Sequence, residues 1–283
     1  MTNEQKKQVR DALVRYAANF ETQTSAALSL EGISPSTISQ IKNDNWELLS
    51  DRLWSDVARQ VGFYCADWQP ADTSVNLLLR ILFSDAQHYA MTYGIAIGGG
   101  LGKTFSAIRY VRENENAYYL ACNGEFNRKS FICALTRVLG FEAKGGVPAI
   151  MQQVTDFMVE KEEAILILDD AHKLKDRVLH LIVLLANSFA GKTGIIILGC
   201  EELRTRIIEG VRLKKVGFDD IFKSIGRRFI TLGNLGPKDV ELVCKANGVH
   251  DEDVISYIEE ASAGNLHSTT ELIMQRSELR AAA

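Results

Sequence analysis

Apolar residues near the start of the chain recur about every three or four positions, as on the buried face of a helix. The spacing predicts one helix over residues 3–20 and a second over about 24–30. Ser34 is a good N-cap and Pro35 suits the first helical turn, so a third helix is expected to begin there. A fourth is expected over 46–61. The pattern therefore predicts an N-terminal domain built from helices alone.

From residue 74 onwards, short apolar runs alternate with helical segments. The runs cover 94–97, 117–122, 164–168 and 194–199, and the helical segments cover 74–91, 103–112, 128–139, 147–160 and 179–190. Strands as apolar as these are typical of a parallel sheet covered by helices on both faces. The segment 237–283 is expected to be helical and to form a small lid. The predicted fold class is thus α/β, a parallel sheet flanked by helices, with an all-α domain before it and a helical lid after it.

The same pattern divides the chain into four parts. They are a helical domain over 1–65, a linker over 66–73, an α/β core over 74–232 and the lid over 233–283. The linker shows no clear period of apolar residues, which separates it from the helices on either side.

A glycine-rich turn follows the first apolar run. It consists of Gly98, Gly99, Gly100, Leu101, Gly102, Lys103 and Thr104. Such a turn between a strand and a helix presents backbone N–H groups to phosphate, and its lysine and threonine bind the outer phosphates and Mg²⁺. The strict pattern G-x-x-x-x-G-K-[ST] places a glycine where this chain has Ile97, so the loop is either one residue shorter or takes another path at its first turn. The turn predicts a nucleoside triphosphate site; the alternative is a glycine turn beside an unrelated Lys-Thr pair.

Paired acids, Asp169 and Asp170, end the third apolar run. Phosphate loops lie at the carboxyl ends of the strands of such sheets, which is the edge that these acids share. A carboxylate at the end of a buried strand is the usual second partner of the nucleotide's Mg²⁺. Asp169 and Thr104 are therefore the predicted Mg²⁺ residues.

Composition narrows the class of protein. Hydrophobic residues make up 46% of the chain, and no apolar stretch approaches the ~20 residues that cross a bilayer. The five cysteines are scattered without a Cys-x-x-Cys pair, which fits a reduced cytosolic protein and argues against a zinc site. The first residues lack the apolar core of a signal peptide. We therefore expect a cytoplasmic protein without a membrane partner.

The net charge of −4 argues against a globally basic nucleic-acid binder, although it leaves room for local basic patches. The second and third predicted helices, joined by a turn with a glycine, have the order of a helix-turn-helix motif. The polar residues expected to face DNA there are Ser34, Ser36, Thr37, Gln40 and Lys42. The alternative is a small helical bundle with a polar surface.

A second candidate for DNA contact is a cluster of basic residues late in the core. Its members are Arg204, Arg206, Arg212, Lys214 and Lys215. Cations repeated in every subunit of an assembly would bind phosphates without reading sequence. The alternative is an ordinary solvated surface.

The order of these motifs resembles that of the Mu B-like transposition proteins, and the resemblance covers nearly the full length. Besides the glycine loop, its most specific stretches are 168–174, 197–200 and 218–228. It implies an AAA+ ATPase with ATP and Mg²⁺ as cofactors, which self-assembles into a filament or ring on double-stranded DNA. It also implies that the assembly recruits and activates a DDE transposase on target DNA, largely without sequence preference.

The resemblance assigns roles to further residues. Asp170 stands where the family usually has a glutamate that polarises the attacking water, and its shorter side chain implies slow hydrolysis. Cys200 holds the position of a polar sensor of the nucleotide, although a thiol is a poor donor. His267 lies in the second sensor segment, where arginine is usual, and either contacts nucleotide or only packs.

Two arginines, Arg227 and Arg228, lie where this class offers an arginine to the nucleotide of a neighbouring subunit. The alternative is that they pair with surface acids. The basic cluster falls where related proteins have DNA-tracking loops. Together these roles predict an ATP-dependent target-DNA protein of a transposable element or Mu-like phage. A helicase-loading ATPase and a DNA-binding regulator that has lost hydrolysis remain as alternatives.

Overall fold

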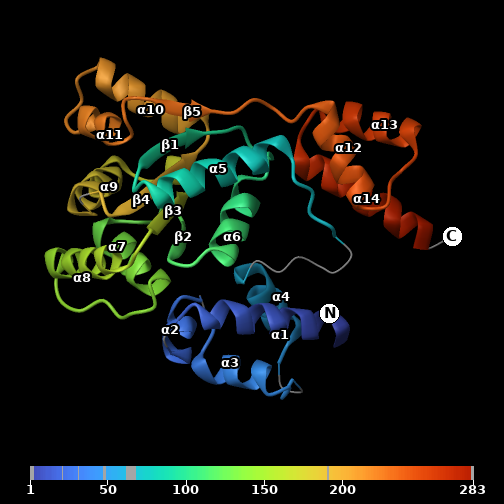
Figure 1. Cartoon of the computed structure of the whole chain (residues 1–283), viewed down its shortest axis with the longest axis horizontal. Helices are drawn as coiled ribbons and strands as arrows, with labels where there is room; N and C mark the ends of the chain where they lie inside the picture. The colour runs from blue at the N-terminus through green and yellow to red at the C-terminus, as the bar shows by residue number, and fades with distance from the viewer. Residues whose placement is uncertain are drawn as a thin grey trace.

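The computed structural model describes residues 3–20, 22–30, 32–46, 49–61, 68–189 and 191–281 of the chain. The predicted boundary between 65 and 66 lies outside these residues, as does Cys65. Within them, the chain forms a helical N-terminal domain, an α/β core and a helical lid (Figure 1).

The N-terminal domain has its own hydrophobic core. Its helices are α1 (Asn3–Ala18), α2 (Gln23–Leu28), α3 (Pro35–Lys42) and α4 (Asp51–Gln60). Trp54 and Val57 of α4 are fully buried in that core. The expected cap of α3 is also present, because the backbone N–H of Thr37 donates to Ser34 Oγ at 3.1 Å.

Helix α4 begins at Asp51, five residues later than the start at 46 that the sequence suggested. Trp46 instead packs edge-on against Trp54, with their ring centroids 5.4 Å apart. Its indole N–H donates to the carbonyl of Ile41 at 3.1 Å. Trp46 therefore closes the hydrophobic core from a loop, a role that apolar spacing does not distinguish from a helical one.

A parallel sheet forms the centre of the core, and its strand order is β2-β3-β4-β1-β5. The strands are β1 (Thr92–Ala96), β2 (Ala117–Ala121), β3 (Ala164–Asp169), β4 (Thr193–Gly199) and β5 (Phe229–Thr231). Every residue of β3 and β4 is buried, which explains the apolar runs 164–168 and 194–199. The predicted parallel sheet is confirmed; the three-residue β5 was not anticipated.

Side chains of the central strands alternate between two hydrophobic clusters, one on each face of the sheet. Leu166 and Leu168 belong to one cluster, and Ile165 and Ile167 to the other. The second face is covered by α5 (Ser74–His88) and α6 (Lys103–Glu113). The first is covered by α7 (Arg128–Val138), α8 (Val147–Glu160), α9 (Asp176–Phe189), α10 (Glu201–Arg212) and α11 (Phe218–Ser224). The predicted layers, helices on both faces of a parallel sheet, are confirmed.

Helix α10 corrects the expectation of a loop in the basic cluster. Residues 201–212 are helical, and the chain turns only after Arg212. Leu203 and Ile207 are fully buried at helical spacing, so this segment packs against the core along its inner face.

The lid consists of α12 (Pro237–Ala246), α13 (Glu252–Ser262) and α14 (Leu266–Ala281). Residues 68–73, which we call the strap, are fastened to it. Asn247 accepts from the backbone N–H of Gln69 at 2.8 Å and donates to its carbonyl at 2.9 Å. Asp239 accepts from the backbone N–H and the hydroxyl of Ser74 at 2.6 and 2.7 Å. The described part of the predicted linker is therefore docked on the lid.

In the part of the chain that the structure describes, no helix combines the length and the apolar character needed to cross a bilayer.

Candidate nucleotide-binding site

The glycine loop begins where β1 leaves the sheet. Ile97 is buried and continues the ladder with β4, because its N–H donates to the carbonyl of Gly199 at 3.0 Å. Ile97 therefore belongs to the strand side of the turn, and the loop starts at Gly98. Of the two explanations for the missing glycine, the structure supports a loop that is one residue shorter.

Two of the loop glycines are required by their backbone conformations. Gly100 and Gly102 have φ angles of +71° and +82°, which favour glycine, and Gly102 caps the start of α6. A Cβ on Gly100 would also collide with the side chain of Asn265. The N–H of Leu266 donates to the carbonyl of Gly100 at 2.7 Å. The start of α14 thus lies directly on the loop, and the lid contacts the site.

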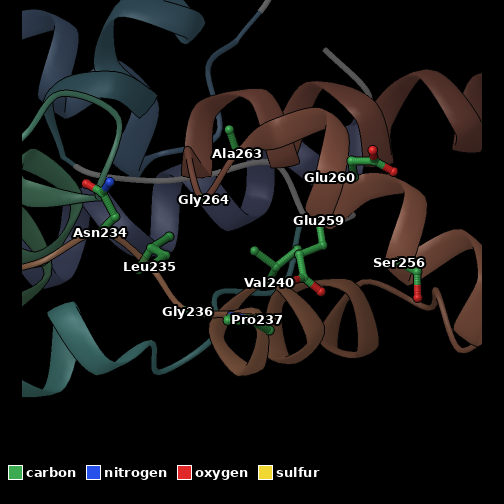
Figure 2. A pocket seen from close by; sticks show the side chains of 10 residues that line it. All are labelled: Asn234, Leu235, Gly236, Pro237, Val240, Ser256, Glu259, Glu260, Ala263 and Gly264. Atoms are coloured by element: carbon green, nitrogen blue, oxygen red, sulfur yellow. The ribbon is translucent and has the colours of Figure 1, made fainter.

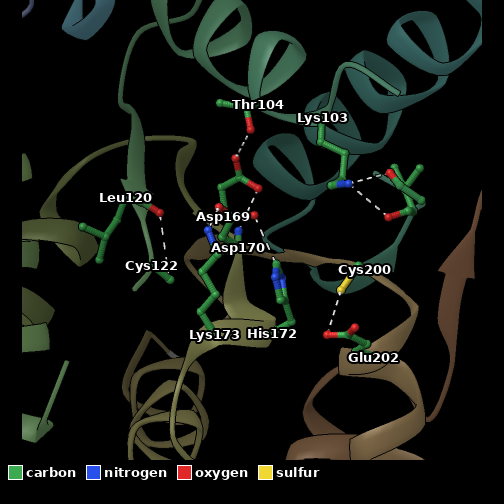
Figure 3. Close-up of polar contacts among 12 residues, drawn as sticks. Lys103, Thr104, Leu120, Cys122, Asp169, Asp170, His172, Lys173, Cys200 and Glu202 are labelled. Atoms are coloured by element: carbon green, nitrogen blue, oxygen red, sulfur yellow. Dashed lines mark hydrogen bonds and ion pairs between the residues drawn. The ribbon is translucent and has the colours of Figure 1, made fainter. Parts of the chain in front are cut away.

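Lys103 and Thr104 open α6, as the motif predicted. The ammonium of Lys103 donates to the carbonyls of Ile97 and Gly98 at 3.1 and 2.6 Å, so it lies folded over the loop (Figure 3). The hydroxyl of Thr104 donates to Asp169 Oδ2 at 2.6 Å. The structure thus joins the glycine loop and the acidic strand end through one side-chain contact.

Asp169 is 1% exposed at the end of β3. Its Oδ1 accepts from the N–H of Asp170 at 2.8 Å, and its Oδ2 accepts from the hydroxyls of Thr104 and Tyr119 at 2.6 and 3.1 Å. Buried carboxylates need such donors. Hydroxyl and carboxylate oxygens side by side are ligands that Mg²⁺ prefers, so Thr104 and Asp169 fit that ion.

Asp170 has a left-handed backbone (φ +54°), which an aspartate tolerates better than most residues. Its Oδ2 is 2.7 Å from the ammonium of Lys173, and its Oδ1 is 4.0 Å from His172 Nδ1. The hydrogen bond that the ammonium of Lys173 donates to Asp170 raises the pKa of Lys173, so this group stays charged. The candidate carboxylate for activating water is thus engaged with a cation of the short 3₁₀ helix η1 (Ala171–Lys173).

Cys200 and His267, the two predicted sensors, lie near the loop. Cys200 follows the end of β4, the strand that pairs with β1. Its thiol donates to Glu202 Oε2 at 3.8 Å, a contact within its own turn (Figure 3). His267 follows Leu266 at the start of α14, but its ring is 77% exposed and lies 3.3 Å from Glu271 Oε1. Each side chain is thus engaged by a nearby acid.

Arg227 and Arg228 are not brought to the loop of their own chain. Phe229, the first residue of β5, pairs with Gly94 in the middle of β1, whereas the loop begins at Gly98. Arg228 therefore lies about 16 Å back along the strand direction from the loop. Both arginines are exposed, and Arg227 NH1 lies 3.4 Å from Asp219 Oδ1.

The residues expected to face DNA in the N-terminal domain lie on or just before α3. Ser34, Ser36 and Lys42 are exposed, while Thr37 and Gln40 are half-buried. The Ser34 hydroxyl lies 2.7 Å from that of Ser36 and 2.8 Å from that of Thr37. These three hydroxyls are therefore engaged in the helix cap, which leaves Gln40 and Lys42 as the longer polar side chains of the face.

The basic cluster separates into two kinds of residue. Arg206 donates to the carbonyls of His172 and Leu174 at 3.1 and 2.7 Å, so it fastens α10 to η1. Arg204 pairs with Glu201 one turn earlier. By contrast, residues 212–216, which are the last residue of α10 and the start of the turn to α11, are all exposed. This segment, which we call the basic turn, holds Arg212, Lys214 and Lys215 together with Leu213 and Val216.

A pocket of about 570 Å³ opens between α12 and α13 beside the hinge to the lid (Figure 2). Asn234 at its rim approaches the glycine loop, since its Oδ1 would lie 4.0 Å from a Cβ on Gly98. Glu259 and Glu260 line the other side. Their negative charges oppose phosphate, so the phosphates belong at the glycine loop rather than in this pocket.

Sequence reasoning missed Tyr119 and Asn265 as members of the site. Tyr119 reads as one apolar position of a buried strand, and only the pairing of β2 with β3 places it near Asp169. Asn265 lies in the same segment as the predicted sensor His267, and no role of its own was expected for it. Its side chain accepts from the N–H groups of His267 and Ser268 at 2.9 and 3.2 Å, and an asparagine before a helix is a signal for such a cap.

Comparison with known proteins agrees with this geometry. Residues 98–207 match the family described as AAA domain. Cdc6p from Pyrobaculum aerophilum is similar in structure, with a TM-score of 0.52 and 16% identity over 74% of this chain and 61% of that chain. A point mutant of RuvB from Thermotoga maritima gives a TM-score of 0.48 and 13% identity over 74% of this chain and 62% of that chain. None of the curated proteins matches the chain.

The chain thus spans about three fifths of Cdc6p, and at this identity the likeness shows the fold alone. The sheet order, the flanking helices and the lid make this the AAA+ fold. The matched segment contains the glycine loop, Thr104, Asp169 and Asp170. Residues 98–207 thus match an AAA domain, and they contain the glycine loop and the acidic strand end of the AAA+ fold.

Proposed function

We propose that the protein is an ATP-dependent DNA-binding ATPase of a transposable element or Mu-like phage. In this proposal, ATP drives its subunits to assemble on double-stranded DNA, the assembly delivers target DNA to a DDE transposase, and slow hydrolysis releases the subunits. The observation that carries the nucleotide part is the 2.6 Å contact between Thr104 and Asp169 beneath a glycine loop touched by the lid.

The residues of the site divide the work of phosphoryl transfer to water. The backbone N–H groups of 98–103 bind phosphate oxygens, and Lys103 exchanges its loop carbonyls for the outer phosphates. Thr104 and Asp169 would hold Mg²⁺, which when bound neutralises charge on the phosphates. Asp170 orients the attacking water and accepts its proton. The side chain of Asp170 is one methylene shorter than the usual glutamate, which supports slow turnover, and the 2.7 Å contact with Lys173 adds a small further bias because the pair must loosen first.

The DNA part of the proposal rests on two exposed surfaces. The basic turn offers three cations at the tip between α10 and α11, and α3 offers Gln40 and Lys42. Each surface offers only two or three cationic or amide side chains. Repetition along an assembly raises the effective concentration of each weak contact. The role of the transposase as partner rests on the resemblance to Mu B-like proteins, as does the choice of a filament or a ring.

A second candidate function is a DNA-binding regulator that binds ATP without hydrolysing it. The engagement of Asp170 by Lys173 and of Cys200 by Glu202 favours it, because both residues would have to act on water or phosphate during hydrolysis.

One experiment separates the two functions. Phosphate release would be measured with and without duplex DNA, alongside binding of a fluorescent ATP analogue. We expect slow phosphate release that duplex DNA stimulates. We expect Lys103→Ala to abolish both this release and nucleotide binding. Nucleotide binding with no release above the Lys103→Ala background would favour the regulator. Electron microscopy with ATP and DNA tests assembly, and monomers under all conditions would contradict it.

A further inference from the structure

Tyr119 reaches the candidate Mg²⁺ site from a neighbouring strand. It lies in β2 and pairs in register with Ile167 of β3. Asp169 is two residues further along β3, so its side chain points to the same face of the sheet as that of Ile167. The Tyr119 hydroxyl donates to Asp169 Oδ2 at 3.1 Å. The ring itself packs against the hydrophobic cluster beneath α5 and α6.

This contact fixes the direction of the carboxylate. Asp169 is almost fully buried, and its Oδ2 has two hydroxyl donors, Thr104 and Tyr119. Thr104 is exposed and lies in the first turn of α6, directly after the loop that would accommodate nucleotide and metal. Tyr119 is half-buried in a central layer, where two side-chain torsions locked by packing hold its hydroxyl in place. Of the two hydroxyl donors to Oδ2, Tyr119 is therefore the one that does not depend on the state of the loop, while the backbone N–H of Asp170 holds Oδ1.

We propose that Tyr119 is a positioning residue that holds Asp169 in the orientation required to bind the divalent cation of the nucleotide. The inference rests on the proposed nucleotide function and deepens it, because it names the group that sets the affinity for the cation. Removing a hydrogen bond to a metal-binding carboxylate typically changes metal affinity by about 10- to 100-fold. No chemical step is assigned to the phenol.

The chain supplies a matched control in the preceding residue. Tyr118 lies in the same strand but faces the opposite side of the sheet, where its ring packs edge-on against Phe157 with centroids 5.9 Å apart. Tyr118→Phe and Tyr119→Phe each remove one phenolic oxygen from β2. Any effect of that loss on the stability of the strand should therefore be similar in both variants. Only Tyr119→Phe removes a donor to Asp169.

The test measures the binding of a fluorescent ATP analogue to the full chain as Mg²⁺ is titrated, and again in EDTA. For Tyr119→Phe we expect the Mg²⁺ concentration at half-maximal binding to rise by about 10-fold. We expect its affinity in EDTA to stay within about twofold of the parent protein, and Tyr118→Phe to change neither quantity. Thermal unfolding of both variants is recorded to confirm that they fold.

The outcomes are distinguishable. An unchanged Mg²⁺ dependence in Tyr119→Phe overturns the positioning role and leaves the proposed nucleotide function in place. An equal loss of affinity in EDTA also overturns it, because the residue would then support the fold of the site in general. If the parent protein binds no nucleotide at all, the proposed function fails and this inference fails with it.

Discussion

Asp170, the residue that we propose to activate water, is held by a neighbour in its own turn. The ion pair with Lys173 spans 2.7 Å, but the two side chains are 32% and 49% exposed. Pairs with this exposure contribute about 0–1 kcal/mol because water screens them. The pair therefore biases the orientation of Asp170 without locking it, and a substrate could displace it at small cost.

Replacing Lys173 tests this bias. Lys173→Met removes the cation and frees the carboxylate, so we expect DNA-stimulated phosphate release to rise by about two- to fivefold, as loss of ~0.5–1 kcal/mol would give. Nucleotide affinity should not change. Lys175→Met, at an exposed lysine nearby, is the control and should leave the rate as it was. A lower rate in Lys173→Met would show that the lysine assists the reaction instead.

The residues that sequence reasoning placed at the loop and the strand end share one property. Lys103, Thr104 and Asp169 belong to contiguous patterns, a glycine turn and an acidic strand end, whose meaning is local. The role of Tyr119 depends on β2 pairing with β3, and the role of Asn265 depends on the lid lying against the glycine loop. The residues next to Tyr119 and Asn265 in the sequence indicate neither arrangement. Ile97 was ambiguous because a missing glycine could mean either a shorter loop or a different path, and only the ladder to Gly199 decides between them.

At the scale of elements, α10 divides the basic cluster into residues that pack against the core and residues that are exposed to solvent. Arg206 reaches back to two carbonyls beyond the acidic strand end, so it ties α10 to η1. The basic turn follows the same helix and is exposed throughout. The sequence places these cations within one short stretch, but the helix turns some of them inward along with Leu203 and Ile207. Leu203 and Ile207 show helical spacing in the sequence, but the charged residues between and around them give no sign of which cations lie on the inner face.

The two kinds of residue should respond differently to substitution. Arg206→Ala leaves the carbonyls of His172 and Leu174 without this donor, so we expect the free energy of unfolding to fall by about 1–3 kcal/mol. We expect DNA affinity of the folded protein to be kept. The double change Lys214→Ala with Lys215→Ala should leave unfolding unchanged, weaken duplex DNA binding and reduce its dependence on salt. Denaturant unfolding and a salt series of DNA binding measure both. Loss of DNA affinity in folded Arg206→Ala would contradict this division.

The other misjudged elements were short or obscured by their surroundings. Strand β5 has three residues, too few for a periodic pattern to be seen. Helix α11 has seven residues, and it lies directly before Arg227 and Arg228 in the stretch 218–228 that the resemblance singled out. The longer elements were located to within a few residues, because burial of the central strands on both faces leaves an apolar run that little else in the chain imitates.

At the scale of the whole molecule, the strap and the lid connect the site to the rest of the chain. The strap is bonded to Asn247 and precedes Ser74, which Asp239 of α12 binds. The opposite end of the lid, at Asn265 and Leu266, rests on the glycine loop. The lid therefore contacts both the nucleotide loop and the segment leading towards the N-terminal domain.

The two arginines before β5 lie too far from the glycine loop of their own subunit to contact nucleotide there. Arg228 lies near the opposite end of β1 from the glycine loop, so any contact with nucleotide must be made in a second copy of the chain. Arg227 already has Asp219 as a neighbour at 3.4 Å, which makes Arg228 the better residue to test. If it acts across an interface, one protein can lack the lysine and another the arginine, and a mixed assembly still contains intact sites.

Mixing variants therefore tests the assembly directly. We expect Lys103→Ala and Arg228→Ala each to lose most DNA-stimulated phosphate release, because one lacks a phosphate ligand and the other a cation for transition-state charge. An equimolar mixture of the two should recover a substantial part of the activity, since some interfaces pair an intact loop with an intact arginine.

The matched control mixes the double variant, Lys103→Ala with Arg228→Ala, with either single variant. It should recover nothing, because every subunit then lacks the lysine or every subunit lacks the arginine. A mixture of the two single variants that is no more active than their average would show that Arg228 does not serve a neighbouring subunit, and would return it to the surface role of pairing with acids.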